Sequence, residues 1–221
     1  MEQRECLQKF DRKYCSFNKK YESDFDTFWR WKIHVESDNA HILDKMHFNE
    51  TFHKLSRVLS GWQYARGADA ESDVWNNLKD SLWKISSEYA ELRQFSLLDL
   101  ENIDIRLLEK IWNQMCSIKE YHNQPTDTPL IMSIGKPLML LWGQTTALDS
   151  KVRKNLYNEY SLTFFNVNRW TFKQWLGSLY LNYKFLKENS YFIDVIDKKS
   201  LEKYGVTQPV PYGRFLDIYY F

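Results

Sequence analysis

One 24-residue stretch holds the side chains with the clearest chemical potential in this chain. Residues 133–156 read SIGKPLMLLWGQTTALDSKVRKNL, in which a lone acid, Asp149, precedes three cations, Lys151, Arg153 and Lys154. A carboxylate at the start of a helix accepts hydrogen bonds from free backbone N–H groups, and the helix dipole favours its ionised form. Asp149 is therefore expected either to cap a helix and do nothing more, or to hold a negative charge at the mouth of a cleft.

The residues around Asp149 predict a helix, a turn and a second helix. Pro137 suits the first turn of a helix, where its missing N–H costs nothing. Residues 138–142 are continuously apolar, which predicts a helix that is buried nearly all round. Gly143 is suited to end this helix in a left-handed conformation. Residues 144–148 then connect to a new helix that begins at or after Asp149.

Hydrophobic periodicity predicts helices over much of the remaining chain. Apolar residues recur at helical intervals in residues 24–33, 41–62, 74–92, 103–118 and 168–187. The final GRFLDIYYF is expected to form a packed turn or helix. Only 7 Gly and 5 Pro occur and no stretch alternates like a strand, which disfavours a sandwich or a barrel. We expect a mainly α fold, a single-domain helical bundle over residues 1–221, in which residues 1–22 form a short helix or a loose arm.

Composition and motifs exclude several classes of protein. The cysteines, Cys6, Cys15 and Cys116, are odd in number and widely spaced, which argues against a disulfide framework and a zinc site. No phosphate-binding loop, dinucleotide fingerprint, HExxH or GxSxG motif occurs, so no cofactor and no metal is expected. No apolar run reaches the roughly 18 residues of a membrane span, and the N-terminus is too charged for a signal peptide. A cytoplasmic location and no membrane partner are expected.

Charge is spread unevenly along the chain although the net charge is only +1. Residues 136–203 carry 11 Lys and Arg against 6 Asp and Glu, whereas residues 1–135 carry 18 against 22. This asymmetry indicates either a side that faces a polyanion or ordinary solvated helix faces.

The segments IGKPLMLLWG and TALDSKVRKNL resemble the helix-hairpin-helix DNA glycosylase superfamily over about 24 residues. In that superfamily a glycine-rich hairpin turn leads into a buried helix, and an Asp follows at the start of the next helix. The resemblance implies a catalytic role for Asp149 and a hairpin turn at residues 133–136 that holds a DNA phosphate. The position of the amine nucleophile of bifunctional members falls on Pro137, and Lys136 is expected to point elsewhere, so a monofunctional enzyme is expected.

The resulting hypothesis is a DNA glycosylase that hydrolyses the N-glycosidic bond of a damaged or modified base flipped out of double-stranded DNA. Asp149 would stabilise the positive charge that develops on the sugar. The candidate substrate contacts are Trp62, Gln63, Tyr64, Trp142 and Gln144. The candidate contacts to the DNA backbone are Gly135, Lys136, Lys151, Arg153, Lys154, Arg169 and Lys173.

Two other functions fit the same residues. The first is a DNA-binding relative without catalysis, which the single glycine of the predicted turn favours. The second is a helical protein-interaction module with no nucleic-acid role, which the near-neutral net charge favours. The sequence specifies neither a target base nor an oligomeric state.

Overall fold

The computed structural model describes residues 3–17, 19–36, 40–64, 73–116, 130–162 and 169–221. Within these ranges the chain is mainly α-helical, with an isolated antiparallel bridge between Leu130 and Arg169 and no strand, so the predicted mainly α class is confirmed. The elements are α1 (Gln3–Ser16), α2 (Lys19–Glu36), α3 (Phe48–Gly61), α4 (Asp73–Lys84), α5 (Ser86–Leu92), the 3-10 helix η1 (Leu97–Asn102), α6 (Ile105–Met115), α7 (Ile131–Leu141), α8 (Ser150–Glu159), α9 (Phe172–Glu188), α10 (Ser190–Tyr204) and α11 (Tyr212–Tyr220).

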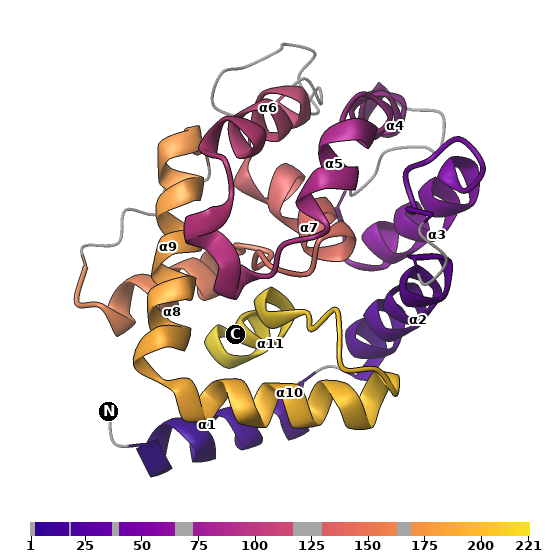
Figure 1. The fold of residues 1–221 in the computed structure, drawn as a ribbon. Coiled ribbons are helices and arrows are strands. Elements are labelled where there is room, and N and C mark those ends of the chain that lie inside the picture. Colours follow the sequence, from indigo (N-terminus) through magenta and orange to yellow (C-terminus); the bar gives the residue numbers. More distant parts are fainter. Residues whose placement is uncertain (1–2, 18, 37–39, 65–72, 117–129, 163–168) are drawn as a thin grey trace.

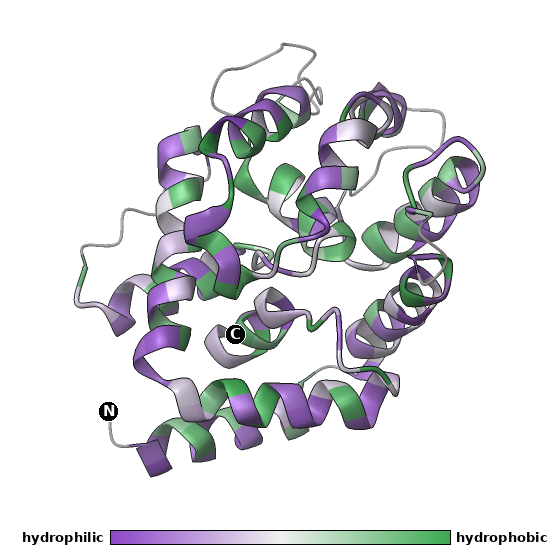
Figure 2. Cartoon of the chain, in the orientation of Figure 1, coloured by the Kyte–Doolittle hydropathy of each residue, from purple (hydrophilic) through white to green (hydrophobic). Residues whose placement is uncertain are grey.

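Helices α7 and α11 lie inside a ring formed by the other helices (Figure 1). Every residue of α11 is buried, and most of α7 is buried as well. The surrounding helices mix hydrophilic and hydrophobic residues along their length (Figure 2), as expected for amphipathic helices with one face on a core. None of the helices in the described ranges has the length and apolarity needed to cross a membrane.

Several helix boundaries differ from those expected from the sequence. The N-terminal segment is a helix, α1, packed against α11 through buried Cys6 and Phe10, and it is not a loose arm. The helix expected over residues 74–92 is divided at Ile85 into α4 and α5. Helix α3 begins only at Phe48. Helix α10 was not anticipated, because its apolar residues do not form a single stripe.

The turn expected at residues 133–136 is wrong. Helix α7 runs unbroken from Ile131 to Leu141, so these residues and Pro137 lie inside it. A proline inside a helix leaves the carbonyl four residues earlier without its N–H donor. Here the Tyr64 hydroxyl donates a hydrogen bond to the Ser133 carbonyl oxygen at 2.9 Å and replaces the missing donor. The continuous helix therefore depends on a contact from a distant part of the chain.

Gly143 ends α7 as expected from the sequence. Its φ of +76° is left-handed, and its N–H donates to the Met139 carbonyl oxygen at 3.0 Å. A Cβ on Gly143 would lie 2.3 Å from the Trp29 ring, so the position requires glycine for its packing as well as for its conformation.

Residues 144–148 form a fully buried connection between α7 and α8. A Cβ on Gly135 of α7 would lie 2.8 Å from the Ala147 carbonyl oxygen. A Cβ on Gly213 of α11 would lie 2.4 Å from the Thr145 carbonyl oxygen. The connection therefore passes between two helices that approach its backbone closely enough to exclude any side chain.

Substituting these glycines tests the close approach. Gly135→Ala and Gly213→Ala should each destabilise the fold by about 1–3 kcal/mol, because a methyl group would displace buried backbone. The matched control is Gly177→Ala in α9, where a Cβ meets nothing within 4 Å. This control should be stabilising by roughly 0.5–1 kcal/mol, since alanine is the better helix former. Urea unfolding of the three variants measures the differences, and equal effects at all three positions would contradict the packing described.

Candidate active site

A cavity of about 240 Å³ lies beside the start of α8. Its walls come from distant parts of the chain: α2, the end of α3, α7, the connection at residues 144–148 and α11. Charged side chains (Asp149, Lys136, Arg214 and Asp217) and aromatic rings both line it. Convergence of ionisable groups in an otherwise apolar cavity is the usual pattern of a binding or catalytic site.

Asp149 caps α8 and lines this cavity. Its Oδ1 accepts hydrogen bonds from the backbone N–H groups of Lys151 and Val152, both at 2.9 Å. Within the described residues no hydrogen bond reaches Oδ2. The predicted N-cap is thus confirmed, and the carboxylate retains an oxygen that a ligand can meet.

The residue before Asp149 has a strained backbone. Leu148 is buried and has a φ of +57°, in the left-handed region that bulky side chains rarely adopt. This conformation turns the chain from the buried connection into α8. It fixes the direction in which Asp149 leaves the core.

Lys136 lines the cavity, whereas the sequence predicted that its side chain would point elsewhere. Its Nζ donates a hydrogen bond to the Trp62 carbonyl oxygen at 2.7 Å. Burial lowers the pKa of Lys136, and the nearby carboxylates of Asp149 and Asp217 partly offset that effect. The site therefore contains an amine whose neutral form is easier to reach than that of an exposed lysine.

Asp217 is a site residue that the sequence analysis missed. It comes from α11, it is 3% exposed, and its Oδ1 accepts a hydrogen bond from the Ala147 N–H at 2.8 Å. Burial raises the pKa of Asp217 to about 7; Asp149 adds to the rise, while Arg214 opposes it. The available signal was an acid inside the otherwise apolar end of the chain, three residues after an arginine.

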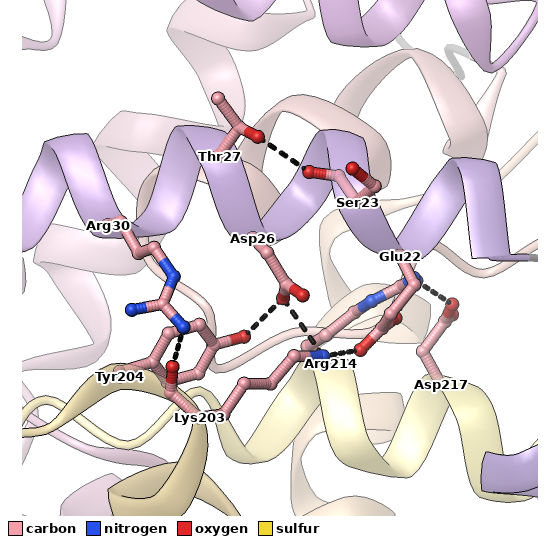
Figure 3. A network of polar contacts seen from close by, with 9 residues as sticks. All are labelled: Glu22, Ser23, Asp26, Thr27, Arg30, Lys203, Tyr204, Arg214 and Asp217. Carbon is pink, nitrogen blue, oxygen red and sulfur yellow. Dashed lines mark hydrogen bonds and ion pairs between the residues drawn. The ribbon is translucent and has the colours of Figure 1, made fainter.

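Arg214 lines the cavity and belongs to a polar network between α2, α10 and α11 (Figure 3). Its guanidinium donates to Asp217 at 3.2 Å and to Glu22 at 2.9 Å. Burial alone would raise the pKa of Glu22, but Arg214 and Lys203 outweigh burial and lower it. These pairs keep the buried arginine compensated, which is the condition for placing a charge inside a protein.

The network continues away from the cavity. Lys203 pairs with Glu22 and with Asp26, the latter at 2.9 Å, and the Tyr204 hydroxyl donates to Asp26 at 2.8 Å. Arg30 donates to the Lys203 carbonyl oxygen. Helix α2 is thus fastened to α10 and α11 by charge pairs along one side (Figure 3).

Aromatic rings surround the guanidinium of Arg214. It lies 4.8 Å from the Phe17 ring centre and 5.4 Å from that of Trp62. Phe221 and Tyr21 complete the aromatic lining. Of the aromatic contacts expected from the sequence, Trp62 therefore lies at the cavity, whereas the Tyr64 hydroxyl is bonded to α7.

Gln63 lines the cavity and has an unusual backbone conformation. The Gln63 N–H donates to the Ser60 carbonyl oxygen and the Tyr64 N–H to that of Leu59, which is the Schellman pattern that ends a helix. Its third element is a left-handed residue, normally glycine, and Gln63 fills it with a φ of +57°. The exposed side chain of Gln63 is held at the cavity at a conformational cost.

Trp142 and Gln144, both expected at the substrate, do not line this cavity. The Trp142 Nε1 donates to the Phe95 carbonyl oxygen at 2.9 Å. The Gln144 Oε1 accepts from the Leu97 N–H at 2.8 Å, and its Nε2 donates to the Val210 carbonyl oxygen at 2.9 Å. Gln144 thus joins the buried connection to η1 and to the segment before α11.

The residues expected at the DNA backbone separate into three groups. Lys136 lines the cavity, where it is bonded to the Trp62 carbonyl oxygen. Lys151, Lys154, Arg169 and Lys173 are exposed, as such contacts require. Gly135 is buried under the connection, and Arg153 is 1% exposed, with its guanidinium 5.8 Å from the Trp170 ring centre. Neither can reach a phosphate in this conformation.

Lys151 is an exposed cation beside the site. Its Nζ lies 4.3 Å from the ring centre of Phe221, which lines the cavity. In the part of the chain that the structure describes, no group of three or more His, Cys, Asp or Glu side chains is arranged to hold a metal ion. No family model, curated protein or solved structure matches this chain.

The raised pKa of Asp217 predicts a pH-dependent stability. Between about pH 4 and 7 the folded state holds a proton on Asp217 that the unfolded chain has released, so acidification favours the folded state. Relative to Asp217→Asn, the parent should lose roughly 1 kcal/mol of stability per pH unit as the pH rises through this window. Urea unfolding at several pH values measures the difference. If the free energy of unfolding depends on pH in the same way in both proteins, the pKa of Asp217 is not raised.

Proposed function

We propose that this protein is an N-glycosyl hydrolase that acts on a damaged or modified base flipped out of duplex DNA. The observation that carries the proposal is the placement of Asp149: a helix-capping carboxylate with one oxygen left for a ligand, in a cavity with aromatic walls. A flipped base needs such a cavity, since its glycosidic carbon is not reachable inside the base stack.

Asp149 supplies the charge that the reaction requires. As the bond between C1′ and the base nitrogen breaks, positive charge develops on the sugar. A carboxylate fixed by two backbone N–H groups stabilises this charge without rearranging. It also accepts a hydrogen bond from the water that attacks C1′. Trp62 offers a ring for stacking on the base, and Gln63 offers an amide at the mouth of the cavity.

Exposed cations beside the site support binding to the DNA backbone. Lys151 and Lys154 lie on α8, directly after Asp149. Contacts to phosphates by such residues make binding weaken steeply with added salt, because bound counterions are released. Salt-insensitive binding or no binding to duplex DNA would instead favour a protein-interaction module.

Asp149→Asn tests the proposed role of the carboxylate. Asparagine remains a good helix cap but carries no charge. We expect the rate of abasic-site formation to fall by about 10²–10³-fold, as is typical when a group that stabilises the transition state is lost. The assay is alkali cleavage of duplexes that carry one deaminated, oxidised or alkylated base.

The matched control is Asp104→Asn at the N-cap of α6. Asp104 also caps a helix, through a hydrogen bond from the Arg106 N–H at 2.9 Å, and it does not line the cavity. Its substitution should leave the rate unchanged. An Asp149→Asn variant that cleaves like the parent would assign the chemistry to another residue. If the parent binds DNA but never cleaves it, the protein is a non-catalytic DNA-binding protein.

The position of Lys136 favours a second activity, strand cleavage through an imine. Its amine lies in the cavity with Asp149, and burial lowers its pKa. The neutral Nζ can form a bond to C1′ as the bond to the base breaks, and the base leaves with the electron pair and takes up one proton from the nitrogen. The C1′–O4′ bond of the sugar ring then breaks, O4′ takes the second proton from the nitrogen, and the resulting imine is reduced by borohydride to a stable cross-link.

Borohydride trapping separates the two activities. If Lys136 reacts, the parent protein becomes covalently attached to DNA and Lys136→Met abolishes the attachment completely. The exposed Lys151→Met is the control and should retain it. Base release by the parent without any trapped complex would assign it to the hydrolases that use water alone.

A further inference from the structure

The cavity contains a second carboxyl group, and the two differ in their surroundings. Asp149 caps α8 and is only partly buried, with two N–H groups bonded to one oxygen. Asp217 comes from α11, 68 residues later in the chain, and is almost completely buried. Two carboxyl groups held in unlike environments in one site are the usual arrangement for an acid and an anion that act together.

The groups that face Asp217 come from several elements. Arg214 of α11 donates to its Oδ2, and Glu22 of α2 shares that arginine. Lys136 of α7 and Asp149 of α8 both act on it electrostatically. Burial outweighs the two cations, so the pKa of Asp217 is raised to about 7.

A backbone contact ties Asp217 to the segment that carries Asp149. The Ala147 N–H bonded to Asp217 Oδ1 belongs to the buried connection, two residues before Asp149. Both carboxyl groups, together with Lys136, line the same cavity. Their relative placement is therefore set by the core and does not depend on a surface loop.

We propose that Asp217 is a second catalytic residue, which donates a proton to the departing base while Asp149 remains anionic. This inference rests on the proposed function. The bond between C1′ and the base nitrogen breaks, and its electron pair moves to the base. The proton of Asp217 passes to the base, and the oxygen of a water molecule bonds to C1′. The proton that this water loses restores Asp217, so the net reaction consumes one water.

This role predicts a dependence on the leaving group. A neutral base, such as hypoxanthine, leaves as an anion unless it is protonated. An N7-methylguanine already carries a positive charge and leaves as a neutral molecule without a proton donor. Loss of an acid catalyst should therefore slow the release of the first base and not that of the second.

The experiment compares duplexes that carry a single hypoxanthine or a single N7-methylguanine. We expect Asp217→Asn to slow hypoxanthine release at least 100-fold and N7-methylguanine release less than threefold. Asp149→Asn should slow both. For hypoxanthine, the parent rate should fall above about pH 7 as Asp217 loses its proton, and this alkaline decline should be absent in Asp217→Asn.

Glu22→Gln is the control for a purely structural effect. It removes the other carboxylate that Arg214 contacts, and a disturbed arginine should alter the two rates by the same factor. Equal slowing of both substrates by Asp217→Asn would overturn the role as an acid, as would unchanged rates. A parent that forms no abasic sites in any of the duplexes with a deaminated, oxidised or alkylated base would refute the proposed function itself, and the acid role would fall with it.

Infrared spectroscopy tests the protonation without any substrate. At pH 6 the parent should show the carbonyl band of a protonated carboxylic acid, and this band should disappear by pH 9 and be missing from Asp217→Asn. Identical spectra from parent and variant at pH 6 would overturn the inference even if both enzymes were active.

Discussion

The burial of one connecting segment, residues 144–148, is the constraint on which the rest of the structure depends. Buried backbone must find hydrogen-bond partners inside the protein, because an unpaired N–H or carbonyl group is costly there. Asp217 provides such a partner for the Ala147 N–H, and the Gln144 side chain bonds to the backbone of Leu97 and Val210 on the other side of the segment. Gly135 and Gly213 allow the two flanking helices to approach its backbone closely. Without these contacts α7 and α11 could not share one core with the connection between them.

The same constraint produces the candidate site. The carboxyl group that satisfies the Ala147 N–H is Asp217, and the Arg214 guanidinium donates a hydrogen bond to its other oxygen. Arg214 also donates to Glu22, which joins α2 to the cavity. The chain leaves the buried segment through Leu148 and places Asp149 at the cavity. The site is therefore built from the groups that make the buried segment possible. Asp217 both bonds to the backbone of this segment and lines the cavity.

Local signals in the sequence were sufficient for the parts of this arrangement that are locally determined. The cap at Asp149 and the left-handed Gly143 both follow from preferences of single residues at helix ends. The location of Pro137 does not, because the Tyr64 hydroxyl that makes a mid-helix proline tolerable comes from the end of α3. Propensity placed Pro137 in a first turn, and tertiary contact placed it in the middle of a helix.

The missed and misplaced site residues have a related cause. Lys136 occupies a helix face that could be assigned only once α7 was known to continue through residue 136. Asp217 gives no local signal, since its environment is created by α7, α8 and α2 around it. Trp142 and Gln144 are adjacent to the buried segment in sequence but bond to backbone on its other side. Side-chain direction at a core connection depends on packing, which a single sequence does not specify.

Two non-glycine residues close to the cavity have strained backbone conformations. Gln63 lines the cavity and Leu148 directly precedes Asp149, which also lines it, and both are non-glycine residues in the left-handed region. Each such residue costs roughly 1–3 kcal/mol unless the surrounding structure fixes it. At Leu148 a glycine would remove a buried side chain, so packing accounts for part of the cost there. At Gln63 the side chain is exposed, so its packing does not offset the cost of the strained backbone. Glycine at position 63 would avoid this cost, so the strain at Gln63, unlike the strain at Leu148, is not offset by burial of its side chain.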